Sequence, residues 1–290
     1  MIARLRAAGC VWAEDEAAVL AGSARTPAEL DAMVARRAAG EPLEQVVGWA
    51  EFCGLRVFVD PGVFVPRRRS EFLVSVAVGQ VRERAFPRRP VLADLCCGTG
   101  ALGLAVAAEL DRVRGPGGSG LAPPHAAGLH AADLDPAAVA CARRNVEPAG
   151  GRVYSGDLFG PLPPGLRGRI DVLTCNAPYV PTPEIAFMPA EAREHEGLTA
   201  LDGGADGLAV LRRVTADAGG WLAPGGVLLV ETSERQAPAM AAAMTASALA
   251  ARVHTDDEYG ATVVTGVLRL RRPTLRLGRR SIMTATSVML

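Results

Sequence analysis

The chain has 290 residues, 49% of them hydrophobic, which suffices for one large α/β domain with a small second one. Its 31 Lys and Arg balance 31 Asp and Glu, which excludes an overall basic field that draws a protein to nucleic acid regardless of sequence. The six cysteines form no C-x-x-C pair and no histidine lies at ligand spacing, so neither a zinc site nor a disulfide framework is indicated. No signal-peptide core or membrane-spanning run is present, and we expect a cytoplasmic monomer that neither enters a membrane nor binds nucleic acid stably.

Residues 1–50 are predicted to form a small helical domain. Residues 14–39 are rich in Ala, Leu, Glu and Arg, and their break at residues 23–27 contains a Thr26-Pro27 pair typical of a helix start. Residues 51–66 then alternate apolar and polar side chains around Asp60-Pro61-Gly62, a strong turn signal. We therefore predict a β-hairpin centred on this turn, within a linker over residues 51–75.

From residue 91 onward, short apolar runs alternate with helical segments, which is typical of a parallel sheet with crossover helices. The predicted strands are residues 91–95, 128–132, 152–154, 170–175, 226–231, 252–255 and 261–270. The predicted helices are residues 101–110, 136–146, 207–218 and 234–249. This indicates an α/β fold with a seven-stranded mixed sheet over residues 76–270. The Gly- and Pro-rich residues 114–125 are expected to form a mobile surface loop and residues 271–290 a disordered tail.

The turn after the first predicted strand reads D-L-C-C-G-T-G-A, from Asp94 to Ala101. Gly98 and Gly100 let the backbone pass close to a ligand, and the following helix start offers free N–H groups. A pyrophosphate motif G-x-G-x-x-G is not indicated, because the frame that ends at Gly103 starts the helix too late. Asp94 would repel a pyrophosphate, but it could bind an ammonium group or structure the loop. A tight turn without a ligand is the alternative interpretation.

Acidic residues also follow the second and third predicted strands, at the same edge of the sheet. Asp133 stands where nucleoside-binding folds hold a ribose diol. Asp135, which precedes a proline, is predicted to be a helix N-cap. Asp157 with Leu158 follows the third strand and suits an adenine amino group. Each acid alone could be a cap or a turn residue, but together with Asp94 they indicate an adenosine-shaped site.

The tetrapeptide N-A-P-Y, residues 176–179, follows the apolar strand 170–175. Pro178 keeps Ala177 extended, so the Ala177 carbonyl and the Asn176 side-chain oxygen converge on one small volume. Each acceptor can take one hydrogen of a planar NH2 group, while the Tyr179 ring covers one face and excludes water. An amide nitrogen is unreactive because its lone pair is delocalised, and hydrogen bonds that pyramidalise it would favour the transition state. The alternative is a simple turn that ends the strand.

Longer stretches carry a family resemblance. They are residues 37–48 (R-A-A-G-E-P-L-E-Q-V-V-G), 58–67 (F-V-D-P-G-V-F-V-P-R), 191–196 (E-A-R-E-H-E), 201–208 (L-D-G-G-A-D-G-L) and 222–231 (L-A-P-G-G-V-L-L-V-E). Over residues 37–270 the chain resembles class I S-adenosylmethionine-dependent methyltransferases. Within them it resembles the protein-(glutamine-N5) methyltransferases that modify the Gly-Gly-Gln loop of peptide-chain release factors, or a close relative acting on a ribosomal protein. The resemblance implies a Rossmann-like fold, S-adenosylmethionine as cofactor, and a protein substrate recognised by the N-terminal domain.

The resemblance also implies a role for each candidate residue. The cofactor-binding set comprises Asp94, Gly98 and Gly100 for the methionine part, Asp133 for the ribose, Asp157 and Leu158 for the adenine, and Asn176. The substrate-binding set comprises Asn176, Ala177, Pro178 and Tyr179, of which Asn176, Pro178 and Tyr179 are the catalytic residues. No metal is implied.

Two motifs depart from the family pattern. The loop reads C-C-G-T-G from Cys96 to Gly100 where the family usually has G-T-G-S-G, and Ala177 replaces the second residue of N-P-P-Y. A backbone carbonyl serves at position 177 in either case, but alanine lacks the fixed φ of proline, which leaves the loop less preorganised. The chain therefore looks like a member of a divergent branch of the family. These departures bear on the identity of the substrate more than on the methyl transfer itself.

Several polar residues outside these motifs have open roles. Arg67, Arg68 and Arg69 either contact a protein substrate or are solvated. His195 is predicted to order its loop, since an amide that loses a proton after methylation needs no strong base. Glu231 is placed near the active-site rim by the resemblance, and is otherwise a cap.

Four other functions remain open. One is methylation of an exocyclic adenine amine in nucleic acid, which is also a planar NH2 group once the base is flipped out. Another is methylation of a small-molecule amide or amine. The third is a cofactor-binding protein without catalysis that acts through its N-terminal domain, and the fourth, least favoured, is a nicotinamide-dependent dehydrogenase.

Overall fold

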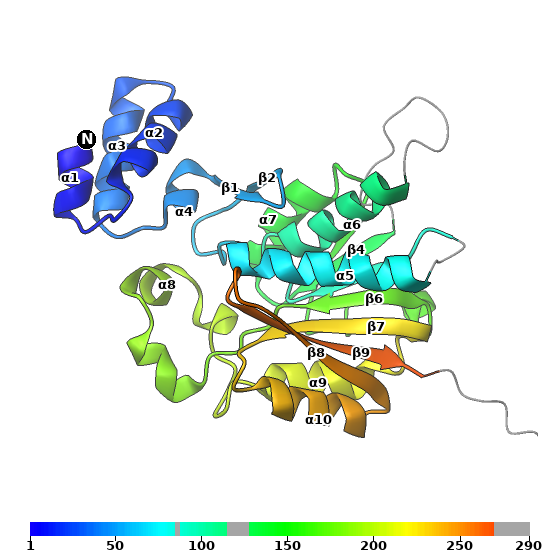
Figure 1. The fold of residues 1–290 in the computed structure, drawn as a ribbon. Coiled ribbons are helices and arrows are strands. Elements are labelled where there is room, and N and C mark those ends of the chain that lie inside the picture. Colours follow the sequence, from blue (N-terminus) through cyan, green and yellow to red (C-terminus); the bar gives the residue numbers. More distant parts are fainter. Residues whose placement is uncertain (85–87, 115–127, 270–290) are drawn as a thin grey trace, which may run out of the picture.

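The computed structural model describes residues 1–84, 88–114 and 128–269 of the chain (Figure 1). The loop expected at residues 114–125, apart from the helix-ending Arg114, and the tail expected at residues 271–290 lie outside the described residues. Within the described part, no helix is both long and apolar enough to cross a membrane.

The N-terminal part forms four helices that stand at one end of the molecule (Figure 1). They are α1 (Ile2–Ala7), α2 (Ala13–Ser23), α3 (Pro27–Ala38) and α4 (Leu43–Val47). They share a small core of their own that includes Leu5, Leu20 and Val34. The Thr26 hydroxyl oxygen accepts a hydrogen bond from the Glu29 N–H at 3.1 Å and a proline follows it, so the predicted helix start is confirmed.

A β-hairpin follows, but its turn is not where the sequence pattern placed it. Strands β1 (Trp49–Phe52) and β2 (Leu55–Phe58) pair antiparallel around Cys53 and Gly54, which have φ of 50° and 71°. A two-residue turn with both φ values positive matches the right-handed twist of hairpin strands, which accounts for this position. The predicted turn at residues 60–62 is therefore wrong as a hairpin centre. Gly62 instead forms an isolated parallel bridge with Glu196.

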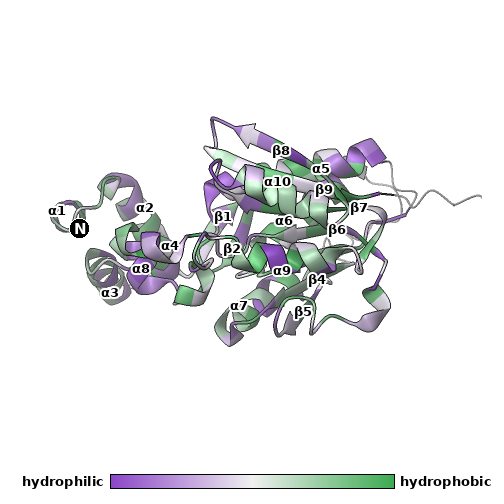
Figure 2. Cartoon of the chain, turned by 90° about the horizontal axis from the view of Figure 1, so that it is seen from below, coloured by the Kyte–Doolittle hydropathy of each residue, from purple (hydrophilic) through white to green (hydrophobic). Residues whose placement is uncertain are grey.

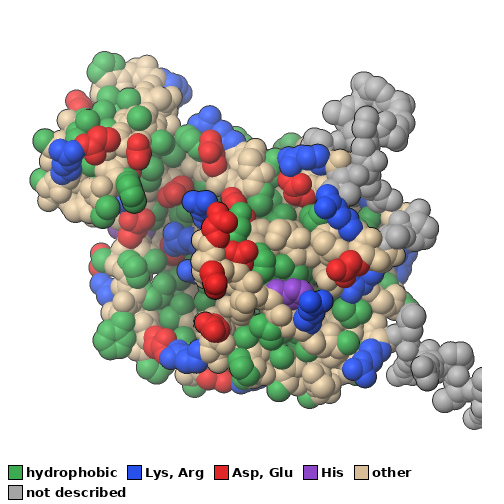
Figure 3. Space-filling model, viewed as in Figure 1, with side chains coloured by type: hydrophobic (Ala, Val, Ile, Leu, Met, Phe, Trp, Pro, Cys, Tyr) green, Lys and Arg blue, Asp and Glu red, His purple; other side chains and the backbone are tan. Residues whose placement is uncertain are grey.

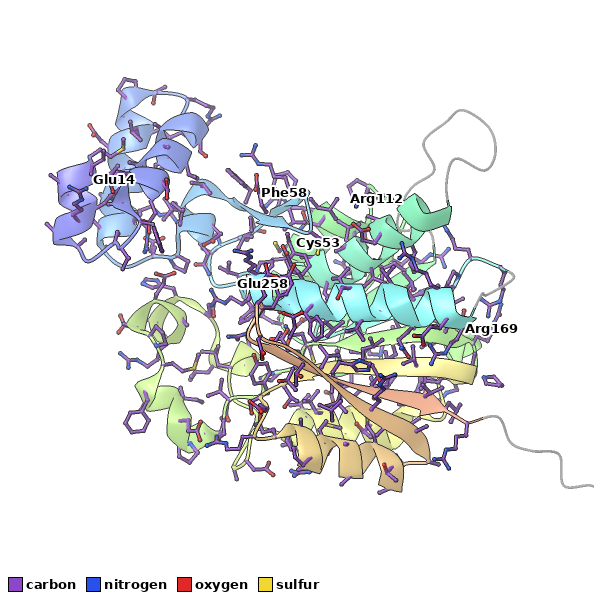
Figure 4. All side chains as sticks on the ribbon, in the orientation of Figure 1. Glu14, Cys53, Phe58, Arg112, Arg169 and Glu258 are labelled. Carbon is purple, nitrogen blue, oxygen red and sulfur yellow. The ribbon has the colours of Figure 1, made fainter. Side chains whose placement is uncertain are left out.

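One asparagine helps to attach the hairpin to the sheet domain. The Phe58 N–H donates to the Asn145 side-chain oxygen at 2.8 Å, and Asn145 Nδ2 donates to the carbonyls of Phe58 at 3.0 Å and Thr99 at 2.9 Å. Figure 4 labels Phe58 and Cys53 on the hairpin, next to α6 (Ala101–Arg114) and α7 (Pro136–Val146). The chain then runs through a short turn, η1 (Arg68–Ser70), into α5 (Glu71–Arg84).

The remaining strands form a seven-stranded sheet in the order β5-β4-β3-β6-β7-β9-β8. They are β3 (Leu92–Leu95), β4 (Leu129–Asp133), β5 (Arg152–Ser155), β6 (Ile170–Cys175), β7 (Leu222–Thr232), β8 (Leu249–Asp256) and β9 (Ala261–Leu268). The first five in the sheet order pair parallel, whereas β9 pairs antiparallel with both β7 and β8. The predicted mixed α/β sheet is confirmed.

Helices cover both faces of the sheet. On one face α5, α6 (Ala101–Arg114) and α7 (Pro136–Val146) share a hydrophobic core. On the other face α9 (Ala209–Ala218) and α10 (Ala237–Ala246) pack on the strands, and Figure 2 shows α10 in mostly hydrophobic or neutral colours. The helix predicted at 234–249 was too long, because Ala248 adopts a left-handed φ of 61° and the chain enters β8 at Leu249.

A segment of short helices connects β6 to α9 and lies near the N-terminal helices. It contains η3 (Thr182–Phe187), α8 (Ala190–His195) and η4 (Leu198–Ala200), while η2 (Pro164–Leu166) precedes β6. Arg37 on α3 pairs with Glu16 at 2.7 Å and with Glu191 on α8 at 3.1 Å. Gln45 on α4 also donates to the His195 carbonyl at 3.2 Å. These contacts fasten the helical part to the segment over the sheet.

Candidate active site

One cavity lies at the carboxyl edge of the parallel strands. Its walls come from the loops after β3, β4, β5 and β6, closed over by residues 62–70 and 196–201. Nine of the ten sequence-predicted site residues line it: Asp94, Gly98, Asp133, Asp157, Leu158, Asn176, Ala177, Pro178 and Tyr179. The carboxyl ends of neighbouring parallel strands meet at one edge, which is why residues far apart in sequence converge here.

Gly100 is the exception, since it is not among the residues that line the cavity. A Cβ at Gly100 would lie 2.6 Å from Val146 Cγ2 on α7, and its φ is +78°. Glycine at 100 therefore lets two helices approach, whereas Gly98, with φ +54°, faces the cavity and has open space where a Cβ would stand.

Asp94 is buried at the end of β3 and holds two strands and a helix together. Its Oδ1 accepts from the Thr174 hydroxyl at 2.8 Å and its Oδ2 from the Gly103 N–H at 3.0 Å. Burial raises the pKa of the Asp94 carboxyl to about 7, although these two hydrogen bonds oppose the rise. Asp94 therefore structures the loop and at the same time lines the cavity.

Asp133, at the end of β4, organises the glycine loop. Its carboxylate accepts from the N–H groups of Gly98 at 2.8 Å and of Asp135 at 2.9 Å. Burial raises the pKa of this carboxyl, and the backbone N–H groups counteract that rise. The Asp135 side chain accepts from the Ala137 N–H at 2.8 Å, which confirms the predicted N-cap of α7.

Asp157 differs from the other two acids because it is exposed and paired. Both of its oxygens accept from the guanidinium of Arg213, which lies on α9 and also lines the cavity. The next residue, Leu158, adopts a left-handed φ of 48°. The Asp157–Arg213 pair therefore forms the outer rim of the cavity beside β5.

The N-A-P-Y loop leaves β6 directly into the cavity wall. Asn176 Nδ2 donates to the Ser70 hydroxyl oxygen at 3.2 Å, and no hydrogen bond within the described ranges reaches Asn176 Oδ1. Ala177 is buried. The amide of Asn176 thus has its donor end occupied and its acceptor end available at the cavity.

Tyr179 is fixed by a buried carboxylate behind the cavity wall. Its hydroxyl donates to Glu231 Oε1 at 2.9 Å, and Arg69 Nε donates to the same oxygen at 3.1 Å. The Arg69 guanidinium also lies over the Tyr179 ring, 5.8 Å from its centroid. Burial and the neighbouring Glu231 raise the pKa of the Tyr179 phenol, so the hydroxyl stays protonated. Glu231 itself is buried and does not line the cavity.

Sequence reasoning missed several residues of this arrangement. Ser70 and Arg213 follow no motif that would have singled them out. Arg67 forms an ion pair with the buried Glu196, so neither it nor Arg69 is merely solvated. His195 offers its backbone carbonyl to Gln45, a contact that does not involve the imidazole, so the loop-ordering role stays a prediction.

Cys96 occupies the first position of the loop in a left-handed conformation, with φ +54°. This conformation favours glycine, the residue usual at this place in the family that the sequence resembles. Cys96 therefore adopts a backbone conformation that a glycine would adopt without strain. Across the described ranges, no group of three or more His, Cys, Asp or Glu could hold a metal ion.

Charge is mixed outside the cavity. Figure 3 shows acidic and basic side chains interspersed over the face in view, with no area of one sign spread across it. At the cavity, Arg67 and Arg69 are matched by Glu196 and Glu231. The acceptor side of the cavity is thus close to electrically neutral.

Comparison with known proteins identifies the relatives of this chain. A release factor glutamine methyltransferase of Streptomyces coelicolor is 38% identical over 204 residues, which cover 70% of this chain and 67% of the relative. A 4-amino-L-phenylalanine/4-methylamino-L-phenylalanine methyltransferase of Streptomyces pristinaespiralis is 35% identical over 207 residues, covering 70% of this chain and 65% of that enzyme. No protein-family model matches the chain.

The fold has its counterpart among solved structures. A methyltransferase of Pyrococcus furiosus superimposes with a TM-score of 0.51 at 16% identity, covering 81% of this chain and all of that protein. This likeness concerns the fold alone. The family is shown by the sequence relatives. The chain belongs to the release factor glutamine methyltransferase family.

Proposed function

We propose that this chain transfers a methyl group from S-adenosylmethionine to the side-chain amide nitrogen, N5, of a glutamine in a protein. We propose further that this protein is a peptide-chain release factor, modified in its Gly-Gly-Gln loop. The observation that carries the proposal is a single cavity that joins the acidic strand ends to the N-A-P-Y loop. A nucleoside-bearing methyl donor and a planar NH2 acceptor can share such a cavity.

The residues on the β3 to β5 side fit the cofactor. Asp133 faces the cavity with lone pairs beyond the two that its backbone partners use, which suits a ribose diol. The open space at the Cβ position of Gly98 leaves room for a ligand against the backbone. Asp157 and Leu158 would hold the adenine, and Asp94 and Gly98 the methionine part. When bound, the cofactor supplies an electrophilic methyl group on a sulfonium centre.

The residues on the β6 side fit an amide. Asn176 Oδ1 and the Ala177 carbonyl would accept the two hydrogens of the NH2 group and orient the nitrogen lone pair. Positive charge develops on this nitrogen during transfer, and two preorganised acceptors stabilise it. Pro178 would fix the direction of the Ala177 carbonyl, and the Tyr179 ring would exclude water. Because Glu231 neutralises Arg69, the site does not repel a cationic methyl donor.

The N-terminal helices, residues 1–50, would recognise the protein that carries the glutamine. Two observations support this role: the helices have their own small core, and Arg37 and Gln45 fasten them to the segment beside the cavity. Residues 51–75 would act as the linker and residues 76–270 as the methyltransferase domain. The monomeric state and the cytoplasmic location stay predictions.

Methyl transfer from labelled S-adenosylmethionine to purified release factors tests the proposal, with the modified residue located by mass spectrometry. We expect label on the Gly-Gly-Gln glutamine with the native enzyme and a loss of at least about a hundredfold with Asn176→Ala, because one of two transition-state acceptors is removed. Asn145→Ala, which changes the other asparagine of the chain, is the matched control. Cofactor binding without label on any release factor would refute the proposed substrate.

A small-molecule amine is the second candidate, and two observations favour it. The Streptomyces pristinaespiralis relative is named as a methyltransferase of 4-amino-L-phenylalanine, which is an aromatic amine. Ala177 also replaces a proline of the family motif, which loosens the loop at the acceptor. An aromatic amine presents a planar NH2 group as well, so the same clamp would serve. Turnover of free aromatic amines and amides in the same assay, with no label on release factors, would establish this candidate.

A further inference from the structure

Ser70 and Asn176 meet in the wall of the cavity although they are 106 positions apart in the chain. Ser70 ends the η1 turn and is buried, and its hydroxyl oxygen accepts from Asn176 Nδ2 at 3.2 Å. No other side-chain hydrogen bond within the described ranges reaches the Asn176 amide. Among the described residues, one serine hydroxyl therefore holds the donor end of this amide.

Orientation matters because a side-chain amide has one donor end and one acceptor end. With Nδ2 bound to Ser70, Oδ1 is left for the N–H of an acceptor group. A rotated amide would place its own NH2 against the NH2 of the acceptor, two donors facing each other. We propose that Ser70 is a positioning residue that holds Asn176 in the orientation required for methyl transfer. The proposal rests on the function proposed above.

The turn that carries Ser70 is held in place by hydrogen bonds and an ion pair of Ser70 and its neighbours in sequence. Its N–H donates to the Arg67 carbonyl at 2.9 Å. Arg69 is paired with Glu231, and Glu71 Oε1 accepts from the Cys53 N–H at 2.9 Å. The turn is thus anchored to β7 on one side and to the hairpin on the other. A hydroxyl on such a turn has its position set before any substrate binds.

The first test needs no substrate. The chain contains two asparagines, Asn145 and Asn176, so selective ¹⁵N-asparagine labelling gives two side-chain NH2 signals, assigned by their loss in Asn176→Ala and Asn145→Ala. We expect Ser70→Ala to speed solvent exchange of the Asn176 NH2 by about five-fold or more, the effect of losing one ordinary hydrogen bond. The Asn145 NH2, bound to Phe58 and Thr99, is the internal control and should not change.

The second test measures methyl transfer to whichever substrate the labelling assay above identifies. Ser70→Ala should lower kcat about ten-fold, and Ser70→Thr should restore most of it because the hydroxyl is kept. In an Asn176→Ala background, Ser70→Ala should not lower kcat any further, since Ser70 acts through Asn176. Ser75→Ala, which removes a serine hydroxyl one turn further along α5 where it bonds the Phe72 carbonyl, controls for a general effect on the helix.

The outcomes separate the two proposals. Unchanged exchange of the Asn176 NH2 in Ser70→Ala, with an unchanged melting temperature, overturns the positioning role whatever the activity. An equal loss from Ser70→Ala in the native and Asn176→Ala backgrounds also overturns it. If the native enzyme labels no glutamine, the proposed function fails, and the exchange measurement still decides whether Ser70 holds Asn176.

Discussion

The Asp94 carboxylate on β3 and the Thr174 hydroxyl on the neighbouring β6 are joined by a hydrogen bond of 2.8 Å inside the protein. The Gly103 N–H supplies the second partner of Asp94, and the Thr174 hydroxyl also lies 3.3 Å from the Ala93 carbonyl. A titratable group is thus built into the junction of two strands and a helix, directly at the cavity. This carboxyl should therefore contribute to the dependence of stability on pH.

We expect Asp94→Asn to make the protein relatively more stable at high pH. Asparagine can keep the network, because its oxygen accepts from Gly103 while its NH2 donates to Thr174, whose hydroxyl then donates to Ala93. The folded pKa of Asp94, about 7, lies above its ordinary value of 3.8. The stabilising contribution of protonated Asp94 is present below pH 4 and is lost as pH rises through 7. Urea unfolding of both proteins at pH 5 and pH 8 checks this, and an equal difference at both pH values contradicts it.

Replacement of Cys96 by glycine should stabilise the fold. The left-handed conformation of Cys96 costs about 1–2 kcal/mol for a residue with a Cβ, whereas glycine loses about 0.5–1 kcal/mol of chain entropy. Cys96→Gly is therefore expected to raise the free energy of unfolding by up to about 1 kcal/mol. Cys97→Gly, at a buried neighbour that does not have a positive φ, should lower it. Thermal unfolding of the two variants and the native protein tests this prediction. A melting temperature of Cys96→Gly below that of the native protein would contradict the strained conformation of Cys96.

Gly100 and Gly79 should respond oppositely to alanine. At Gly100 a Cβ would meet Val146 Cγ2 at 2.6 Å in a backbone of positive φ, so Gly100→Ala should destabilise by about 2–3 kcal/mol. At Gly79, inside α5, a Cβ would meet nothing within 4 Å, and Gly79→Ala should stabilise by up to about 1 kcal/mol. Chemical denaturation measures both. Similar values for the two variants would mean that α6 and α7 do not approach closely at Gly100.

The Arg69–Glu231 pair should show strong coupling. The Glu231 side chain is 2% exposed. Among the residues that the structure describes, Arg69→Met leaves this buried carboxylate with the Tyr179 hydroxyl as its remaining hydrogen-bond partner. We expect Arg69→Met to destabilise by about 1–3 kcal/mol, and Arg69→Met with Glu231→Gln to recover most of that loss. A double-mutant cycle of unfolding free energies measures the coupling. If the changes in unfolding free energy of the two single variants simply add up, Arg69 does not stabilise the buried Glu231 carboxylate.

Local sequence determined most of the sheet and nine of the residues that line the cavity. The β6 strand and the α7 helix occur at the predicted residues. A short, mostly apolar run predicts a buried strand, and an amphipathic period that starts with a proline predicts a helix, so both signals lie within the segment itself. The acids after β3, β4 and β5 and the N-A-P-Y loop converge on one cavity, since parallel strands bring their carboxyl ends to one edge.

Tertiary structure alone decided the contacts between distant segments. The hairpin turns at Cys53 and Gly54 despite the stronger turn signal at residues 60–62, because pairing with the partner strand outweighs local propensity. The partners of Asn176 and Tyr179, namely Ser70 and Glu231, lie 106 and 52 positions away. No pattern in the sequence predicts hydrogen bonds between residues so far apart, because these bonds depend on how the helices and strands pack rather than on neighbouring residues. Sequence therefore placed the chemical groups, and packing set their orientation.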